Sequence, residues 1–238
     1  MKESLIILPG WGGTKETWQK FVDIAQQDFD VHVINLPCFG DEPCPEEVWG
    51  VEQYADFVKN KLSELRTPNS ELILLGHSFG GAVALQCAVS NPDMFSKLIL
   101  SGAAIFRPER TIRKIFFKSI ARAGMYLFKL PFLEKFDSFA KKLLYTVAHS
   151  DYNETSGIKR DIFKKIIEQD RGELLPQVNI PTLLVHGTLD TYVPVAYARR
   201  ATKLIPDAKL EIIDRGKHGL HIQQPEHFYT VIKQFAES

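Results

Sequence analysis

The chain has 238 residues, which predicts one domain with room for an insertion. Apolar residues make up 45% and charged residues 24%, which is typical of a soluble globular protein and excludes collagen-like, coiled-coil and disordered chains. The 29 basic and 29 acidic residues balance, so the total charge gives no indication of nucleic-acid binding.

Short apolar runs alternate with amphipathic segments along the chain. The runs that predict buried strands cover residues 5–8, 31–36, 72–75, 98–100, 182–185 and 210–213. Helical spacing of apolar residues marks segments at 54–65, 82–89 and 228–235. Strands that alternate with helices favour the α/β class, with a six-stranded mainly parallel sheet flanked by helices.

One region interrupts this alternation. About eighty residues separate the fourth apolar run from the fifth, which is far more than one crossover helix needs. The intervening segment is rich in Phe, Leu, Lys and Ile. We therefore predict a core formed by residues 1–106 and 176–238, and a helical lid formed by residues 107–175 and inserted after the fourth strand.

The cysteines and the N-terminal segment bear on the cellular compartment in which the protein is expected. Cys38, Cys44 and Cys87 are an odd number without metal-binding spacing. Cys38 and Cys44 could lie close together in one loop, but free thiols in a reducing cytosol are the favoured interpretation. The first apolar run is too short for a signal peptide, and no stretch is long enough to span a membrane. We therefore expect a cytoplasmic protein without stable membrane insertion.

Residues 76–81 read Gly-His-Ser-Phe-Gly-Gly, directly between the third predicted strand and a predicted helix. This is the G-x-S-x-G pattern in a strand–turn–helix setting. A nucleophilic serine must stand on a tight turn where a base can reach it, and glycines provide the space. The helix that begins at Phe79 directs free N–H groups toward a developing oxyanion. The motif predicts that Ser78 is a nucleophile.

A nucleophilic serine needs a histidine base and an acid that orients the histidine. Ser78, Asp190 and His218 each follow a predicted strand, so all three should lie at the carboxyl edge of a parallel sheet. Their order along the chain also fits a hydrolase of this kind. His221 and Asp214 remain the alternative base and acid.

Four motifs together resemble a known family. They are residues 9–13 (Pro-Gly-Trp-Gly-Gly), 76–81, 186–194 (His-Gly-Thr-Leu-Asp-Thr-Tyr-Val-Pro) and 216–218 (Gly-Lys-His) with Pro225 further on. The chain resembles serine hydrolases of the α/β-hydrolase superfamily, and in motif the small carboxylesterases such as the pimeloyl-carrier methyl ester esterases. The resemblance implies the strand order 2-1-3-4-5-6.

The resemblance also assigns roles within the candidate site. The seven-residue step to Pro225 selects His218 over His221, and the His-Gly-x-x-Asp motif places the acid at Asp190. It implies that the backbone N–H groups of Trp11 and Phe79 form the oxyanion hole.

The sequence departs from the family pattern in two loops. Pro9 stands where a histidine commonly braces the oxyanion loop, so this loop must be held differently. Residues 35–40 (Asn-Leu-Pro-Cys-Phe-Gly) resemble an Asp-x-Pro-Gly-x-Gly loop in which Asn35 and Cys38 are replacements. Neither departure removes a catalytic residue.

These observations predict a serine hydrolase that cleaves carboxylic esters through an acyl-enzyme, without a metal or cofactor. A thioesterase or a carbon–carbon bond hydrolase could use the same three residues. A hydrolase-fold binding protein that has lost catalysis is the alternative from another class, although such proteins usually lose the serine or the histidine.

Charge is unevenly distributed along the chain. Residues 107–175 contain 15 Lys and Arg against nine Asp and Glu, whereas the rest of the chain has 14 against 20. Basic residues at the start of this segment interleave with apolar ones, which predicts a basic amphipathic helix. Its charged face could be solvated, could dock an acidic carrier, or could contact an anionic membrane. We expect a small-molecule ester substrate, with carrier-linked or CoA-linked esters as candidates, and a monomer or weak dimer that binds no nucleic acid.

Overall fold

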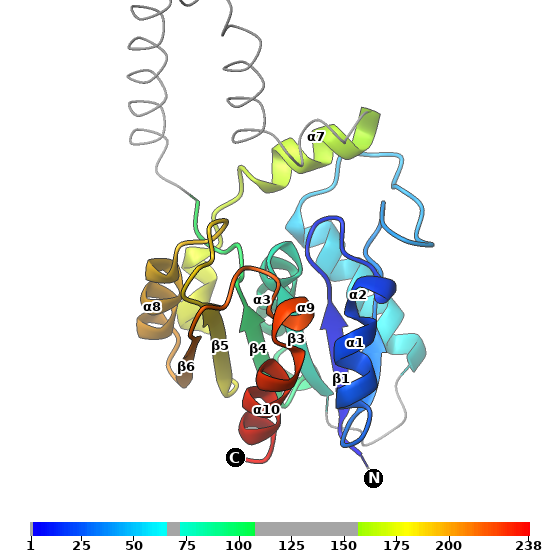
Figure 1. Ribbon diagram of the computed structural model, residues 1–238. Coiled ribbons are helices and arrows are strands. Elements are labelled where there is room, and N and C mark those ends of the chain that lie inside the picture. Colours follow the sequence, from blue (N-terminus) through cyan, green and yellow to red (C-terminus); the bar gives the residue numbers. More distant parts are fainter. Residues whose placement is uncertain (1, 66–71, 108–156) are drawn as a thin grey trace, which may run out of the picture.

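A six-stranded sheet forms the centre of the computed structural model, which describes residues 2–65, 72–107 and 157–238 (Figure 1). Its strands are β1 (Ser4–Leu8), β2 (Asp30–Val33), β3 (Leu72–His77), β4 (Lys97–Ser101), β5 (Thr182–Gly187) and β6 (Ala208–Ile213). Every neighbouring pair is parallel, and the order is β2-β1-β3-β4-β5-β6. The predicted class and strand order are confirmed.

The register of the central strands sets where the site can form. Gly76 of β3 pairs with Leu100 of β4, and Gly187 of β5 pairs with Ile213 of β6. The carboxyl ends of these strands are therefore level, and the loops that follow them meet at one edge. All residues of β3 and β5 are buried, because helices cover both faces of a parallel sheet.

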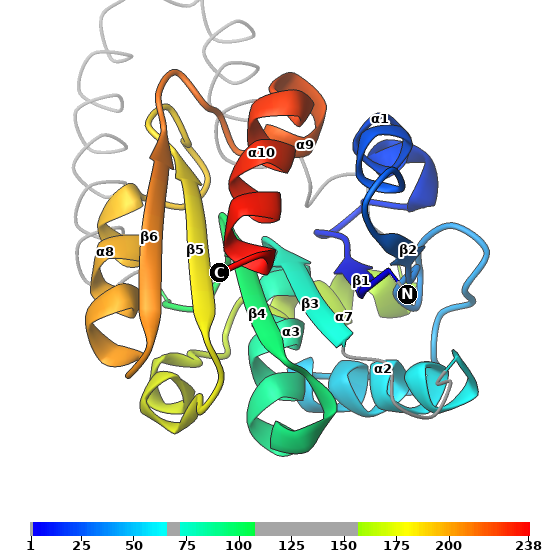
Figure 2. The same ribbon diagram turned by 90° about the horizontal axis from the view of Figure 1, so that it is seen from below.

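Helices cover the sheet in two layers, seen in Figure 2 on opposite sides of the strands. One layer contains α1 (Lys15–Ala25), α9 (Leu220–Gln223) and α10 (Pro225–Ala236), and the other contains α2 (Val51–Leu65), α3 (Phe79–Ser90) and α8 (Val195–Leu204). A short 3₁₀ turn, η1 (Pro92–Met94), joins α3 to β4. Each layer has its own apolar core, and alternate residues of β1 face the two cores.

The helices follow the spacing that the sequence predicted. Tyr54, Val58 and Leu62 of α2 are buried at four-residue intervals, which places them on one face of the helix. The small residues at the start of α3 are buried on all sides, because this helix lies between the sheet and α2. In the described ranges, no helix is long and apolar enough to cross a membrane.

The second strand is shorter than predicted, since β2 ends at Val33 and not at Leu36. The side chain of Asn35 accepts a hydrogen bond from the backbone N–H of Lys15 (2.8 Å) and donates one to Asp41 (2.6 Å). These bonds draw the chain out of the sheet and into a loop. The apolar pattern could not reveal this, because Leu36 remains buried after the strand has ended.

Most of the predicted lid, residues 108–156, lies outside the described residues. Its last part contains α7 (Gly157–Ile166) and the 3₁₀ helix η3 (Gly172–Gln177). Figure 1 shows α7 beyond the carboxyl ends of the strands, while Leu175 of η3 is buried in the core shared with α3. The division into core and lid stays a prediction.

Cys38 and Cys44 form a disulfide bond, so the prediction of free thiols is wrong for this pair, while Cys87 is free and buried. Both lie between β2 and α2, where the N–H of Cys38 faces the carbonyl oxygens of Glu42 (3.2 Å) and Pro43 (3.3 Å). This turn brings the two sulfur atoms together. The cysteine pattern therefore no longer supports the predicted cytoplasmic location.

Candidate active site

Ser78 occupies a sharp turn between β3 and α3. Its backbone has φ 53° and ψ −116°, an unusual conformation for a residue with a side chain. The turn is held from two sides, because the N–H of Ser78 donates to the carbonyl of Ser101 (3.0 Å) and its own carbonyl accepts from Ala104 (3.0 Å). The backbone strain is thus sustained by hydrogen bonds to the end of β4 and the loop after it.

The glycines beside Ser78 allow close backbone contact. A Cβ at Gly76 would lie 2.5 Å from the carbonyl oxygen of Gly80, and one at Gly80 would lie 2.2 Å from that of Leu8. Backbone atoms cannot move aside for such a group. The structure therefore explains both glycines of the motif, and the expectation that they provide space around the serine is confirmed.

His218 and Asp190 are joined by a hydrogen bond of 2.7 Å between Nδ1 and Oδ2. The side chain of Asp190 is 1% exposed and that of His218 is 17% exposed. Asp190 follows β5 and His218 follows β6, and the two loops are bound to each other by the N–H of Leu189 and the carbonyl of Gly216 (2.8 Å). The structure thus brings the predicted acid and base together.

Hydrogen bonds keep Asp190 charged despite its burial. Burial alone would raise the pKa of this carboxyl group, but hydrogen bonds from His218 and from the N–H groups of Val193 (2.9 Å) and Tyr192 (2.8 Å) outweigh it. The net pKa of Asp190 is lower than its ordinary value. The group is therefore an anion at neutral pH, facing Nδ1 of His218.

Gly102 connects this pair to the serine. It follows β4 with φ 51°, and a Cβ there would lie 3.2 Å from both Oδ2 of Asp190 and Nδ1 of His218. Its neighbour Ser101 accepts the hydrogen bond from the N–H of Ser78. The end of β4 therefore borders all three predicted residues.

The alternative acid and base are engaged elsewhere. Asp214 is 85% exposed and accepts a 3.5 Å hydrogen bond from Thr188. His221 is buried and stacks on Trp18, with ring centroids 3.9 Å apart and planes 5° apart. The geometry therefore favours Asp190 and His218, in agreement with the resemblance.

Two aromatic neighbours of His218 were not anticipated. The buried ring of His77 lies 4.7 Å from that of His218, and its Nδ1 lies 3.0 Å from the carbonyl of Ser101. On the outer side, Tyr192 stacks on His218 at 5.0 Å while remaining 65% exposed. The sequence offered one signal for His77, its position at the end of the strand that leads to Ser78.

Trp11 and Phe79, the two predicted oxyanion donors, lie near the serine turn and contact each other. A Cβ at Gly10 would lie 3.1 Å from Cβ of Ser78, so the loop after β1 passes beside the serine. The rings of Trp11 and Phe79 meet edge to face at 5.7 Å. Trp11 therefore lies in a loop that passes beside the serine, and Phe79 directly follows it, while their role as oxyanion donors stays a prediction.

The fold and the motifs together define a hydrolase. The pattern of the alpha/beta hydrolase family matches residues 5–229, and the chain belongs to this family.

Individual relatives are distant but extend over the whole chain. The pimeloyl-[acyl-carrier protein] methyl ester esterase of Vibrio atlanticus is 23% identical over 252 residues, covering 98% of this chain and 94% of its own. The bromoperoxidase of Bacillus anthracis has a TM-score of 0.75 at 20% identity, covering 100% of this chain and 93% of its own. An esterase from Exiguobacterium antarcticum has a TM-score of 0.73 at 20% identity, with coverages of 99% and 92%.

Replacing His221 with phenylalanine is expected to make the protein less sensitive to acid. Burial, and then the nearby His218, lowers the pKa of His221 from 6.5 to about 3. Below pH 6.5 the unfolded chain binds a proton that the folded protein does not, so stability falls by about 1.4 kcal/mol per pH unit. Between pH 7 and pH 5, the free energy of unfolding measured with urea should fall by about 2 kcal/mol more for the wild type than for His221→Phe.

Phenylalanine keeps a ring against Trp18, so the stacking contact is preserved. The matched control is His227→Phe at an exposed position of α10, which should retain the wild-type dependence on pH. Equal acid sensitivity of wild type and His221→Phe would contradict the prediction.

Proposed function

We propose that this protein is a carboxylic-ester hydrolase in which Ser78 is the nucleophile, His218 the general base and Asp190 the acid that orients it. The observation that carries the proposal is the 2.7 Å hydrogen bond between His218 and the buried Asp190, beside a serine on a strained turn. Membership of the hydrolase family and the esterase names among its relatives support the reaction class.

The proposed reaction has two steps. His218 takes the proton from the Ser78 hydroxyl as the oxygen attacks the ester carbonyl, and then gives it to the departing alcohol. Water activated by His218 hydrolyses the acyl-enzyme and releases the acid. Because Asp190 remains a carboxylate, it holds the proton of His218 on Nδ1 and stabilises the imidazolium that forms.

The tetrahedral intermediate needs donors for its oxyanion. We assign this role to the backbone N–H groups of Trp11 and Phe79. Phe79 is the first residue of α3, a 12-residue helix whose N-terminus favours negative charge. Because backbone groups donate these bonds, the side chains are free to pack against each other and fix the positions of the two N–H groups.

The proposed substrate is a small ester, with an acyl carrier or CoA as the group that presents it. The curated relative from Vibrio atlanticus is named for an acyl-carrier substrate. Residues 107–175, the proposed lid, carry 15 basic against nine acidic residues, which suits an acidic carrier. Within the described part of this segment, α7 lies beyond the carboxyl ends of the strands that lead to Ser78 and Asp190 (Figure 1).

Substituting Ser78→Ala is expected to lower kcat for a p-nitrophenyl ester by at least 1000-fold, estimated from nucleophile removal in serine hydrolases. A fluorophosphonate should label the wild-type protein at Ser78 and leave the variant unlabelled. The control Ser90→Ala, at the far end of α3, should retain wild-type activity and labelling. Activity of Ser78→Ala above one tenth of wild type would refute the proposed nucleophile.

The roles of the two aspartates can be separated in the same assay. Asp190→Asn should lower kcat by about 1000-fold or more, because an amide cannot stabilise the imidazolium or enforce the tautomer of His218. Asp214→Asn, at the exposed alternative position, should change kcat less than twofold. The reverse ranking of the two variants would assign the acid to Asp214.

The carrier proposal predicts a difference in salt dependence. The value of kcat/KM for an ester linked to an acyl carrier should fall about tenfold between 0.05 and 0.5 M NaCl, because salt screens attraction to a basic surface. The value for a p-nitrophenyl ester should change less than twofold over this range. If neither substrate responds to salt, docking of an acidic carrier is ruled out.

A further inference from the structure

The loop between β2 and α2 contains a residue in an unusual backbone conformation. Cys38 has φ 78°, in the left-handed region that favours glycine. The Asp-x-Pro-Gly-x-Gly pattern that residues 35–40 resemble has glycine at this position. A residue with a side chain costs about 1–3 kcal/mol in such a conformation and keeps it only where the surroundings impose it.

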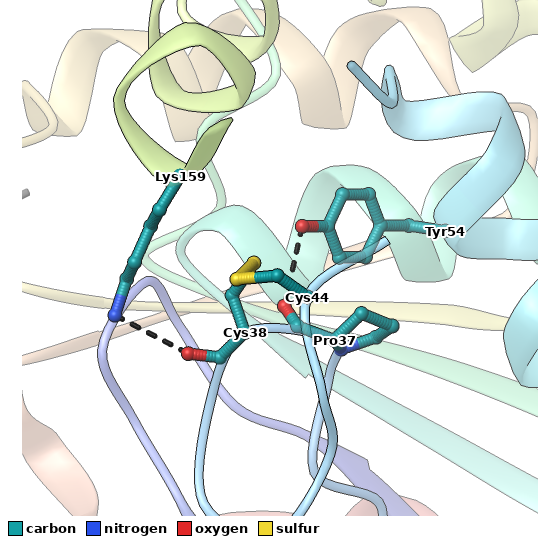
Figure 3. The surroundings of a disulfide bond; sticks show 5 residues. All are labelled: Pro37, Cys38, Cys44, Tyr54 and Lys159. Atoms are coloured by element: carbon teal, nitrogen blue, oxygen red, sulfur yellow. Dashed lines mark hydrogen bonds between the residues drawn. A yellow bond between two sulfur atoms is a disulfide. The ribbon is translucent and has the colours of Figure 1, made fainter. Parts of the chain in front are cut away.

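The surroundings that impose this conformation include the bond to Cys44. The disulfide closes a ring over residues 38–44, within which the N–H of Cys38 faces the carbonyls of Glu42 and Pro43. We call residues 35–44 the disulfide loop. Figure 3 shows Tyr54 and Lys159 on either side of it: the Tyr54 hydroxyl donates to the carbonyl of Pro37 (3.2 Å), and Lys159 donates to that of Cys38 (3.2 Å).

Phe39, the residue after Cys38, contacts the proposed oxyanion loop. Its ring meets Trp11 edge to face at 4.8 Å, and Nζ of Lys159 lies over the same ring, 4.3 Å from its centroid. On α7, Phe163 approaches Trp11 at 5.0 Å. The side chain of Trp11 is therefore held between the disulfide loop and α7.

The disulfide loop also holds the far end of the segment that contains Trp11. The side chain of Asn35 accepts a hydrogen bond from the N–H of Lys15, which follows this segment (2.8 Å). Gly40 permits this approach, because a Cβ there would lie 2.3 Å from Nδ2 of Asn35. We call residues 9–14 the Trp11 loop. The disulfide loop holds it through two contacts, Phe39 with Trp11 and Asn35 with Lys15.

We infer that the disulfide loop is a redox-sensitive brace that positions the Trp11 loop. It takes the place of the histidine that the family pattern has where this chain has Pro9. Breaking the bond frees Cys38 to leave the left-handed region, and Phe39, attached directly to it, then moves away from Trp11. The inference rests on the proposed function, in which the N–H of Trp11 stabilises the oxyanion.

The bond is placed where a reductant can reach it, because Cys44 is exposed. A thiolate of a dithiol attacks one sulfur of the Cys38–Cys44 bond and forms a mixed disulfide, and its second thiolate releases the remaining cysteine. Two electrons and two protons pass from the dithiol to the protein. The products are two cysteine thiols and the oxidised dithiol.

The kinetic signature of the brace lies in kcat. An oxyanion donor interacts with the transition state more strongly than with the substrate, so displacing it lowers kcat and leaves KM nearly unchanged. Complete loss of one donor costs about 100–1000-fold, so a displaced donor is expected to cost about tenfold. A loop that only stabilised the fold would change the unfolding temperature without this kcat effect.

The first experiment compares the oxidised and reduced forms of the full protein. Dithiothreitol, with reduction of both cysteines verified by alkylation and mass spectrometry, should lower kcat for a p-nitrophenyl ester about tenfold. Reoxidation should restore it. Cys87→Ala, which removes the remaining buried thiol, should show the same response as wild type.

Two variants separate the bond from the backbone conformation. Cys44→Ser should have the kcat of the reduced protein, whether or not reductant is present. The double variant Cys38→Gly/Cys44→Ser should recover at least half of the kcat of the oxidised wild-type protein. Its kcat should not change with reductant, because glycine adopts φ 78° without a cross-link. An equally slow double variant would contradict the role given to Cys38.

Amide hydrogen exchange gives a readout that does not depend on the proposed chemistry. Reduction should accelerate exchange in residues 10–14 and leave β4 unchanged, even if Ser78 proves not to be the nucleophile. Unchanged exchange in the Trp11 loop after verified reduction would overturn the brace. If reduction accelerates exchange in the Trp11 loop but the protein has no esterase activity, the proposed function is overturned and the inference about the disulfide loop stands.

Discussion

The carbonyl oxygen of Ser101 accepts hydrogen bonds from the N–H of Ser78 and from Nδ1 of His77, both at 3.0 Å. Ser101 is the last residue of β4, and the next residue, Gly102, donates its N–H to Val185 of β5 (3.0 Å). The strained serine turn is thus bound through β4 to the strand that leads to Asp190. Because the register of the parallel strands fixes the positions of their carboxyl ends, Ser78 and the His218–Asp190 pair form one unit whose geometry depends on the backbone.

Two buried imidazoles beside this unit, those of His77 and His221, stay neutral. Burial, reinforced by His221 and His218, holds the pKa of His77 well below its ordinary value, and burial also lowers the pKa of His221. This neutrality matters for the proposed reaction, in which His218 becomes a cation. Two unit charges 4.7 Å apart, the separation of the His77 and His218 rings, would repel by about 3.5 kcal/mol at an effective dielectric constant of 20. Burial of His77 in its neutral form therefore avoids a large penalty.

Much of the fold and the candidate acid–base pair could be predicted from local signals in the sequence. Runs of branched residues mark strands that are buried on both faces, and glycines mark the turns at which Ser78 and Asp190 leave the sheet. The positions at strand ends then bring the acid and base to one edge without further information. These features depend on residues that are close together in the chain or on the regular geometry of the sheet.

Other features depend on contacts between distant loops, which local patterns do not encode. The early end of β2 follows from the hydrogen bond between Asn35 and Lys15. The Cys38–Cys44 bond is different, because the two residues are six apart in one loop and free thiols were favoured only on the expectation of a reducing compartment. The ring of His77, at the end of β3, meets that of His218, in the loop after β6, across segments far apart in the chain. The end of β2 and the contact between His77 and His218 were missed because their causes lie in tertiary packing.

The parts of the candidate site differ in how they are held in place. Some are positioned by the backbone of the sheet, and others by side chains from outside it. The serine turn and the His218–Asp190 pair are positioned by strand register and by close packing at glycines, where an added Cβ would clash with neighbouring atoms. The Trp11 loop instead depends on side chains from outside the sheet, chiefly Phe39 and Phe163. Under the proposed mechanism, a change in the disulfide loop would therefore move the proposed oxyanion donor Trp11 while Ser78 and His218 remain in place. Catalytic rate would then vary without loss of the fold, because the Trp11 loop is attached to the sheet and is not part of it.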